Sequence, residues 1–392
     1  MSLLELWIKS KKELEGKRVQ QIIAIAGSGK LQDGGITSSE VRRFLSHAPS
    51  VLLSQYAGQC LIDKFENNGF ALQDIVNQVG RRLGFEVEDG KYRGSVGQIG
   101  HDGLWKSLLG HTIIVEVKTT DTYRVDLDAI ADYRRKLIKD GKVDGKNCSV
   151  LIVVGREDTG GLEAQIRGSR HAWDFRLASV EALIRLMMLK ENVEDPQILK
   201  KIISVLVPQE FTRVDGIIDL VFSATEEMQH EIEGAVDERV RVGKKTSRIP
   251  QFTPVDFHAA CIDRIQTSLG RPLVKQTRAT YSSADKSVLV VCAVSRVHQR
   301  GENESFWYAF HPHQKDKLEG AKEAYVAYGC GSEKTVLLIP FSEFRAWLEG
   351  MWKTQLADRF YWHVSIGRES GRLVLRRKKG FAQINLTKYL LK

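Results

Sequence analysis

The feature that most constrains this sequence is a continuous apolar run at residues 150–154, which ends at Gly155. A strand that is apolar at every position has both faces buried, so it belongs in the middle of a covered sheet. A β-branched strand at 113–118 precedes it, and an amphipathic helix at 125–140 lies between the two. We therefore expect an α/β fold.

Shorter elements of the same kind surround this run. Apolar residues recur at helical spacing before Gly84, namely Leu72, Ile75, Val76, Val79 and Leu83. Residues 85–88 alternate as a short strand, and a glycine-rich loop at 89–100 leads to another at 103–105. Helices expected at 162–166 and 179–190 complete a sheet flanked by helices.

The length of 392 residues exceeds the roughly 250–300 residues at which one hydrophobic core stops growing, so we expect two domains. Their charges differ. Residues 239–392 carry 27 Lys and Arg against 13 Asp and Glu, or +14, whereas residues 1–238 carry 31 against 36, or −5. The expected parts are a helical arm (1–60), the sheet domain (61–190), a helical extension (191–238), a basic linker (239–252) and a separate α+β domain (253–392).

The C-terminal domain should contain helices at 257–269 and 342–350, strands at 287–295 and 335–339, and a final hairpin at 361–366 and 372–375. Its basic balance favours a polyanionic partner, and an ordinary solvated basic surface is the alternative. The candidate phosphate contacts are Arg376, Arg377, Lys378 and Lys379. Aromatic residues near 306–310 and 361–362 could stack on a base, but we expect most of them in the core.

The five cysteines form no CxxC pair and are odd in number, which argues against a disulfide framework or a zinc ribbon. A reducing compartment fits this usage, so we expect a cytoplasmic protein. The first residues lack a basic segment and no later run approaches a membrane span, so we expect no export signal and no membrane partner.

The strongest chemical pattern is Asp102 followed, after thirteen residues, by Glu116-Val117-Lys118. Alternate side chains of a strand share a face, so Glu116 and Lys118 should point the same way while Val117 turns to the core. Two carboxylates and the Val117 carbonyl could hold Mg²⁺ for phosphodiester hydrolysis, with the lysine positioning the nucleophile or steadying the oxyanion. Taken alone, the spacing also fits a salt-bridge ladder on a strand surface.

In its context the pattern resembles the PD-(D/E)XK nuclease superfamily, and within it the cleavage domain of the FokI-type restriction endonucleases. The matching blocks follow in the same order over about residues 70–190: 83–85, 102–103, 116–118, 153–155, 163–167 and 177–183. His101 stands in place of the motif's proline, and Glu116 in place of the FokI-type aspartate. The domain order is reversed, since FokI-type enzymes carry the cleavage module at the C-terminus.

The resemblance implies a restriction-endonuclease-like mixed sheet and an enzyme, a Mg²⁺-dependent DNA endonuclease of type II restriction or anti-phage defence type. It implies Asp102, Glu116 and Lys118 as catalytic residues, with Asp102, Glu116 and Val117 at the metal. Products would carry 5′-phosphate and 3′-hydroxyl ends. The expected partners are double-stranded DNA and a second copy of the chain, paired transiently or stably through the helix at 125–140.

Further candidates follow the buried strand. Gln165, Arg167 and Arg170 could contact the backbone of the cut strand, or could form a basic helix end that satisfies its own dipole. Asp74 could add an acidic ligand, but we expect it to be a solvated helix residue. Lys91, in the loop at 89–100, suits a phosphate backbone or a long hairpin turn.

A function of a different class stays open from the residues alone. The chain could be a sensor or partner-binding defence protein whose nuclease domain acts only within a complex. In that case the C-terminal domain would recruit a partner or ligand. Cleavage of DNA by the isolated chain would distinguish the two.

Overall fold

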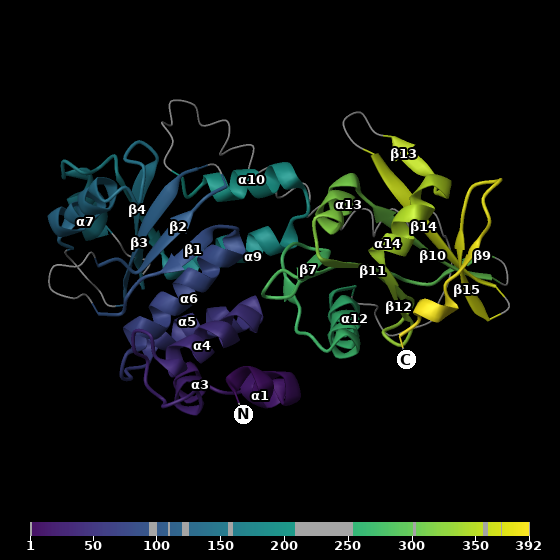
Figure 1. The fold of residues 1–392 in the computed structure, drawn as a ribbon, viewed down its shortest axis with the longest axis horizontal. Helices are drawn as coiled ribbons and strands as arrows, with labels where there is room; N and C mark the ends of the chain where they lie inside the picture. Colours follow the sequence, from purple (N-terminus) through teal and green to yellow (C-terminus); the bar gives the residue numbers. More distant parts are fainter. Residues whose placement is uncertain are drawn as a thin grey trace. The chain divides into compact units, whose positions relative to one another are not determined.

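In the computed structural model the chain forms two compact units, Met1–Ile232 and Glu233–Lys392 (Figure 1). The structure describes residues 2–93, 100–108, 110–119, 125–155, 160–207, 254–300, 303–355, 360–369 and 371–391. The fold is mixed α/β, with sheets flanked by helices, as the sequence predicts. The expected linker and the end of the helical extension lie outside the described residues.

A series of helices precedes the first strand: α1 (Leu3–Lys9), α2 (Lys11–Glu15), α3 (Val19–Ile25), α4 (Ile36–His47), α5 (Ser50–Ile62) and α6 (Asn68–Leu83). A capping box starts α1, because the Ser2 hydroxyl accepts from the Glu5 N–H at 3.3 Å and the Glu5 carboxylate accepts from the Ser2 N–H at 2.8 Å. The apolar side chains of these helices join one hydrophobic cluster with Val115 of the sheet. The helices and the sheet therefore share a core.

The sheet of the N-terminal unit has the strand order β1-β2-β3-β4-β5. Its strands are β1 (Glu86–Asp89), β2 (Gly103–Lys106), β3 (Thr112–Lys118), β4 (Cys148–Val154) and β5 (Phe175–Ser179). β1, β2 and β3 pair antiparallel, whereas β3, β4 and β5 pair parallel. Every residue of β4 is buried, which confirms the prediction from its continuous apolar run.

Helices cover both faces of this sheet. α6 and α9 (Val180–Asn192) pack on the face that carries Ile113. α7 (Leu127–Lys139) and α8 (Gly160–Arg167) pack on the face that carries Ile114. Since side chains alternate along β3, Glu116 and Lys118 belong to the α7 face.

Most of the predicted elements of this unit are confirmed, with small shifts at their ends. The predicted helix before Gly84 is α6, and the strands predicted at 103–105 and 113–118 match β2 and β3 to within one residue. The helical extension begins with α10 (Pro196–Ser204), which packs against α9. The sequence does not predict β5, because its Arg and Ser interrupt the apolar pattern. This segment is a strand because it pairs with the buried strand β4.

The described residues of the C-terminal unit form two sheets, one of order β12-β11-β8-β7-β6 and one of order β16-β15-β14-β10-β9 with β13 paired to β14. The strands are β6 (Val274–Lys275), β7 (Thr280–Ser282), β8 (Val288–Ser295), β9 (His298–Arg300), β10 (Asn303–Phe310), β11 (Glu323–Cys330), β12 (Val336–Pro340), β13 (Lys353–Gln355), β14 (Phe360–Glu369), β15 (Arg372–Arg376) and β16 (Ile384–Asn385). The antiparallel pair β14–β15 confirms the predicted final hairpin.

Helices of this unit share its core with the described sheets. α12 (Pro254–Leu269) covers one face of the first sheet and buries Cys261 there. The other face packs on α13 (Pro312–Glu319), on α14 (Phe341–Trp347) and on the second sheet, so that Tyr328 and the side chains of β10 share one cluster. All five cysteines of the chain are buried and free.

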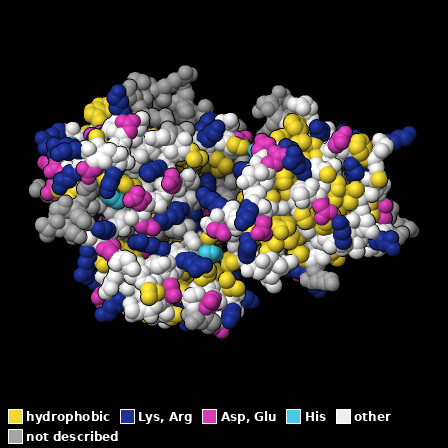
Figure 2. Space-filling model, viewed as in Figure 1, with side chains coloured by type: hydrophobic (Ala, Val, Ile, Leu, Met, Phe, Trp, Pro, Cys, Tyr) yellow, Lys and Arg dark blue, Asp and Glu magenta, His cyan; other side chains and the backbone are white. Residues whose placement is uncertain are grey.

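The aromatic residues of β10 and β14 divide between two faces. As expected, most are in the core, namely Phe306, Tyr308, Phe310 and Trp362. Trp307 points the other way and is 45% exposed. Figure 2 shows that hydrophobic side chains reach the surface of this unit, with Lys and Arg among them.

Candidate active site

The predicted catalytic residues meet where β2 begins and β3 ends. Gly103 lies opposite Val115 in the antiparallel pair β2–β3, so Asp102 lies beside the last residues of β3. The Asp102 main-chain N–H donates to the Val115 carbonyl at 2.9 Å, and Asp102 Oδ2 accepts from the Val117 N–H at 2.6 Å. Both the main chain and the carboxylate of Asp102 are therefore fixed against β3.

Glu116 and Lys118 lie on the face of β3 that Asp102 shares. Lys118 Nζ is 2.6 Å from Glu116 Oε1, and their side chains are 33% and 14% exposed. Burial disfavours the charged ammonium, but the charge and hydrogen bond of Glu116 outweigh burial, so the pKa of Lys118 is raised. Lys118 is thus a cation held next to both carboxylates.

The pKa of the Asp102 carboxyl group is raised, which favours its protonated form. Burial raises this pKa most and the negative charge of Glu116 raises it further, to about 7, although the Val117 N–H and Lys118 act in the opposite direction. Two carboxylates against one lysine leave excess negative charge in a partly buried place. A bound cation would relieve this repulsion.

The donor atoms present here suit Mg²⁺. This ion prefers oxygen ligands, keeps several waters and is commonly held by one or two carboxylates. Among the described residues no group of three His, Cys, Asp or Glu side chains could hold a metal, so main-chain oxygens join Asp102 and Glu116 as candidate ligands. The N–H and C=O of one strand residue point to the same side, and the Val117 N–H points to Asp102. Asp102, Glu116 and the Val117 carbonyl thus offer carboxylate and main-chain oxygens of the kind that Mg²⁺ binds.

Two buried amide side chains on α6 donate hydrogen bonds to the main chain of Asp102. The Asp102 carbonyl accepts from Asn77 Nδ2 at 2.8 Å, from the Gly90 N–H at 3.0 Å and from Gln73 Nε2 at 3.1 Å. Asn77 Oδ1 in turn accepts from the Trp105 indole N–H at 3.0 Å. A side chain at Gly90 would collide with the main chain at Asp102. Sequence reasoning missed these amides, although two amides one helical turn apart within an apolar pattern are a readable signal.

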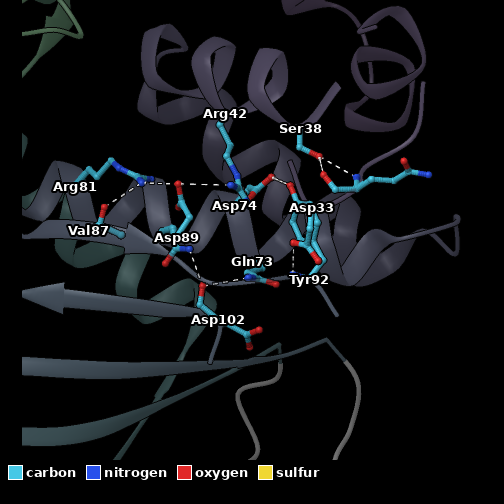
Figure 3. Close-up of polar contacts among 12 residues, drawn as sticks. Asp33, Ser38, Arg42, Gln73, Asp74, Arg81, Val87, Asp89, Tyr92 and Asp102 are labelled. Carbon is cyan, nitrogen blue, oxygen red and sulfur yellow. Dashed lines mark hydrogen bonds and ion pairs between the residues drawn. The ribbon is translucent and has the colours of Figure 1, made fainter. Parts of the chain in front are cut away.

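Asp74, next to Gln73 on α6, belongs to a buried polar network (Figure 3). Arg42 Nε on α4 donates to Asp74 Oδ1 at 2.8 Å, and the Tyr92 hydroxyl donates to Oδ2 at 2.5 Å. Burial raises the pKa of Asp74 to about 6, and the charge of Arg42 and its hydrogen bonds act against that rise. The expectation of a solvated Asp74 is wrong, because α4 packs over this part of α6 and leaves the residue 1% exposed.

The same network anchors the chain where it leaves β1. Arg81 donates to Asp89 Oδ2 at 2.7 Å, at the end of the strand. Asp33 accepts from the main-chain N–H of Tyr92 at 2.8 Å (Figure 3). It also accepts from the main-chain N–H of Arg93 at 3.3 Å. The first part of the predicted basic loop is thus tied to the N-terminal helices, and most of its glycine-rich remainder lies outside the described residues.

The predicted contacts after β4 have structural partners. Gln165 Oε1 accepts from the Val125 N–H at 3.1 Å and Gln165 Nε2 donates to the Val125 carbonyl at 2.6 Å, so Gln165 joins α8 to the start of α7. Arg170 pairs with Asp128 at 2.7 Å, and Arg167 pairs within its own helix and is highly exposed. Within the described ranges none of these three residues forms a hydrogen bond with Asp102. Their contact with DNA stays a prediction.

The four basic residues after β15 are not equivalent. Arg376 Nε lies 3.0 Å from Glu369 Oε1, and Arg377 donates to a main-chain carbonyl nearby at 3.1 Å. The Lys378 main-chain N–H donates to the Gly350 carbonyl, and Lys379 is exposed. The two arginines therefore have structural partners, and the two lysine side chains are the better candidates for phosphate.

No protein-family model and no curated protein matches this sequence. In the part of the chain that the structure describes, no helix is both long and apolar enough to cross a membrane. The function is therefore inferred from the chemistry of the residues and from their geometry.

Proposed function

We propose that this protein is a Mg²⁺-dependent DNA endonuclease of the PD-(D/E)XK kind, with a role in restriction or anti-phage defence. The observation that carries the proposal is the convergence of Asp102, Glu116 and Lys118 at adjoining ends of β2 and β3. The five-stranded sheet with helices on both faces supports a restriction-endonuclease-like fold. The chain's own resemblance to FokI-type cleavage domains supports it too.

Each residue of this centre has a distinct role. When bound, Mg²⁺ would lower the pKa of a coordinated water and offset charge on the phosphate. Asp102 and Glu116 supply carboxylate oxygens, and the Val117 N–H holds the Asp102 carboxylate in place. Lys118, fixed by Glu116, orients the attacking water or stabilises a non-bridging phosphate oxygen. Hydrolysis of this kind leaves 5′-phosphate and 3′-hydroxyl ends.

We propose double-stranded DNA as the substrate and the C-terminal unit as the module that binds it. The basic balance of residues 239–392, +14 from 27 Lys and Arg against 13 Asp and Glu, supports this division of labour. One centre of this type cuts one strand. Two copies of the chain would therefore pair, through the region of α7, to cut both strands.

Plasmid cleavage tests the proposal. Modified and unmodified plasmids are incubated with the full chain in Mg²⁺ or in EDTA, and the wild type should cut in Mg²⁺ alone. Asp102→Asn, Glu116→Gln and Lys118→Met should each lower the rate about a thousandfold or more, since several kcal/mol of transition-state stabilisation are lost.

The matched control is Glu181→Gln, an exposed carboxylate of α9 that pairs with Arg185. This variant should cut like the wild type. Wild-type rates in any of the three centre variants would contradict the assignment. Absence of cutting under every condition would favour a partner-dependent effector instead.

A further inference from the structure

The second sheet of the C-terminal unit has one face in the core and a very different opposite face. Side chains alternate along β10, so buried Phe306 leaves Trp307 on the outside, 45% exposed. On β14, buried Trp362 likewise leaves Tyr361 and His363 on the outside, where they are half-buried. The register of the antiparallel pair β10–β14 brings these outward residues together.

A second exposed tryptophan extends this group. The Trp352 carbonyl accepts from the His363 N–H at 2.8 Å, and Thr354 Oγ1 lies 2.6 Å from His363 Nε2. Residues that lie opposite each other in antiparallel strands share a face, so Trp352, 42% exposed, lies on the side of His363. We call Trp307, Trp352, Tyr361 and His363 the aromatic face.

The rings of Trp307, Tyr361 and His363 are held by one another. The Trp307 indole N–H donates to His363 Nδ1 at 3.0 Å. The Trp307 and Tyr361 rings cross at 82° with centroids 6.2 Å apart, and the Tyr361 and His363 rings lie 5.1 Å apart. These three rings are therefore fixed before any ligand arrives, which lowers the entropy that binding would remove.

Basic residues border the aromatic face. Arg376 lies opposite Ser365 in β14, and its guanidinium lies over Gly367, where a Cβ atom would come within 2.5 Å of it. The Lys378 N–H donates to the Gly350 carbonyl at 2.8 Å, two residues before Trp352. The basic run 376–379 thus passes next to the exposed rings.

An anionic ligand with flat, accessible rings fits both features. Single-stranded DNA is such a ligand, because its bases can stack on aromatic side chains while basic residues contact its backbone. Bases within a duplex are stacked on one another and do not offer their faces. We propose that the aromatic face binds unpaired bases of DNA, with one base stacked on Trp307. This ligand class rests on the proposed function.

The charge of the surroundings distinguishes single-stranded DNA from the other ligand that clusters of aromatic side chains commonly bind. Aromatic side chains also bind quaternary ammonium groups, such as that of a methylated lysine. The nearby Lys378 and the balance of +14 over residues 239–392, 27 basic against 13 acidic residues, repel such a cation and attract a phosphate backbone. The surface therefore favours nucleic acid.

The test is binding of the full chain to a fluorescent single strand of about ten nucleotides, and to the matching duplex, in EDTA so that no cleavage occurs. Trp307→Ala and Tyr361→Ala should each weaken binding of the single strand roughly 5- to 150-fold, because each removes one stacking ring. Trp307→Phe keeps a ring and should lose only a few-fold. Trp173→Ala removes a tryptophan that is 82% exposed in the N-terminal unit, and should bind like the wild type.

Several outcomes overturn the inference. Unchanged affinity in both alanine variants, with circular dichroism showing that they are folded, would do so. Binding to duplex alone, or binding of a trimethyllysine peptide without binding of the single strand, would do so as well.

The result is separable from the fate of the endonuclease proposal. If Trp307→Ala weakens single-strand binding while the wild type cuts no DNA, the aromatic face stands and the nuclease assignment fails. If the chain cuts DNA and the variants of the aromatic face bind normally, the aromatic face alone is wrong.

Discussion

The candidate centre around Asp102 and the aromatic face around Trp307 present side chains in opposite ways. Asp102 has its main-chain N–H, its carbonyl and its carboxylate all hydrogen-bonded, in part to buried side chains of α6. The Trp307 side chain is held by a hydrogen bond to His363 and by ring contacts, and Trp307 is 45% exposed.

This difference follows from what each place would bind. A hydrolytic centre needs its groups within about 0.5 Å of the productive geometry, and buried supporting contacts supply that precision. Stacking on a ring tolerates sliding of the base, so a surface held by a few contacts is adequate. Substitutions near Asp102 should therefore act through folding and geometry, whereas those on the aromatic face should act on affinity alone.

The largest effect is expected where the buried support is broken. Arg42→Met leaves the Asp74 carboxylate buried without its cation, and breaking a buried pair in this way destabilises a protein by about 3–5 kcal/mol. Arg18→Met is the control, since Arg18 pairs with Asp63 in a more exposed place and such pairs contribute at most about 1 kcal/mol. Urea unfolding measures both. Similar small losses in the two variants would show that Asp74 does not depend on Arg42.

The Asp74 carboxylate also predicts a pH dependence of stability. Its pKa of about 6 in the folded chain lies above the unfolded value of about 3.9, so the folded state holds an extra proton between these values. The contribution of the Asp74 carboxyl group to the free energy of unfolding is fully present below about pH 4. It falls by roughly 2–3 kcal/mol as the pH rises toward 6. Asp74→Asn cannot titrate, so its urea-unfolding free energy should fall less over this window. Parallel curves for the two proteins would contradict the raised pKa.

A smaller effect, on catalysis, is expected from Asn77→Leu. Leucine keeps the bulk and the helix propensity, but it removes a donor to the Asp102 carbonyl and the acceptor of the Trp105 N–H. We expect cleavage to slow about 10–100-fold, as for other residues that orient metal ligands, with unchanged DNA affinity. The control is Gln78→Leu, a buried neighbour on α6 without a hydrogen bond to Asp102 among the described residues. Equal rates in the two variants would remove Asn77 from the positioning role.

The features that local rules control could be predicted from the sequence. The buried strand β4 follows from its unbroken apolar run, and the shared face of Glu116 and Lys118 follows from the alternation of a strand. Asp102 could be placed beside them because β2 and β3 are close in sequence. These contacts join residues separated by few positions or by one strand pairing.

The features that escaped prediction depend on elements far apart in the sequence. Asp74 is buried because α4, about thirty residues earlier, packs on α6. Alternation predicts that β10 has two faces, but the packing of the second sheet on α14 decides that Phe310 is buried and Trp307 is exposed. No local pattern contains that information, because burial is a property of the assembled layers.

The smallest effect on DNA binding is expected from substitutions in the basic run 376–379 after β15. In this run the contribution of charge to binding can be separated from that of base stacking. Each phosphate contact on a single strand contributes about 0.7 to the slope of log K against log salt. Lys378→Ala together with Lys379→Ala should therefore reduce the slope by up to about 1.4. Trp307→Ala should lower affinity at every salt concentration and leave the slope unchanged, because stacking releases no counterions.

Arg376→Ala supplies the internal contrast in the same salt titration. Its guanidinium already pairs with Glu369, so removing it should change the slope less than removing the two lysines. If instead Arg376→Ala flattens the slope and the lysine pair does not, Arg376 must leave Glu369 to bind phosphate. The basic border of the aromatic face would then be assembled by the ligand, unlike the centre around Asp102, whose supporting bonds are already in place in the free chain.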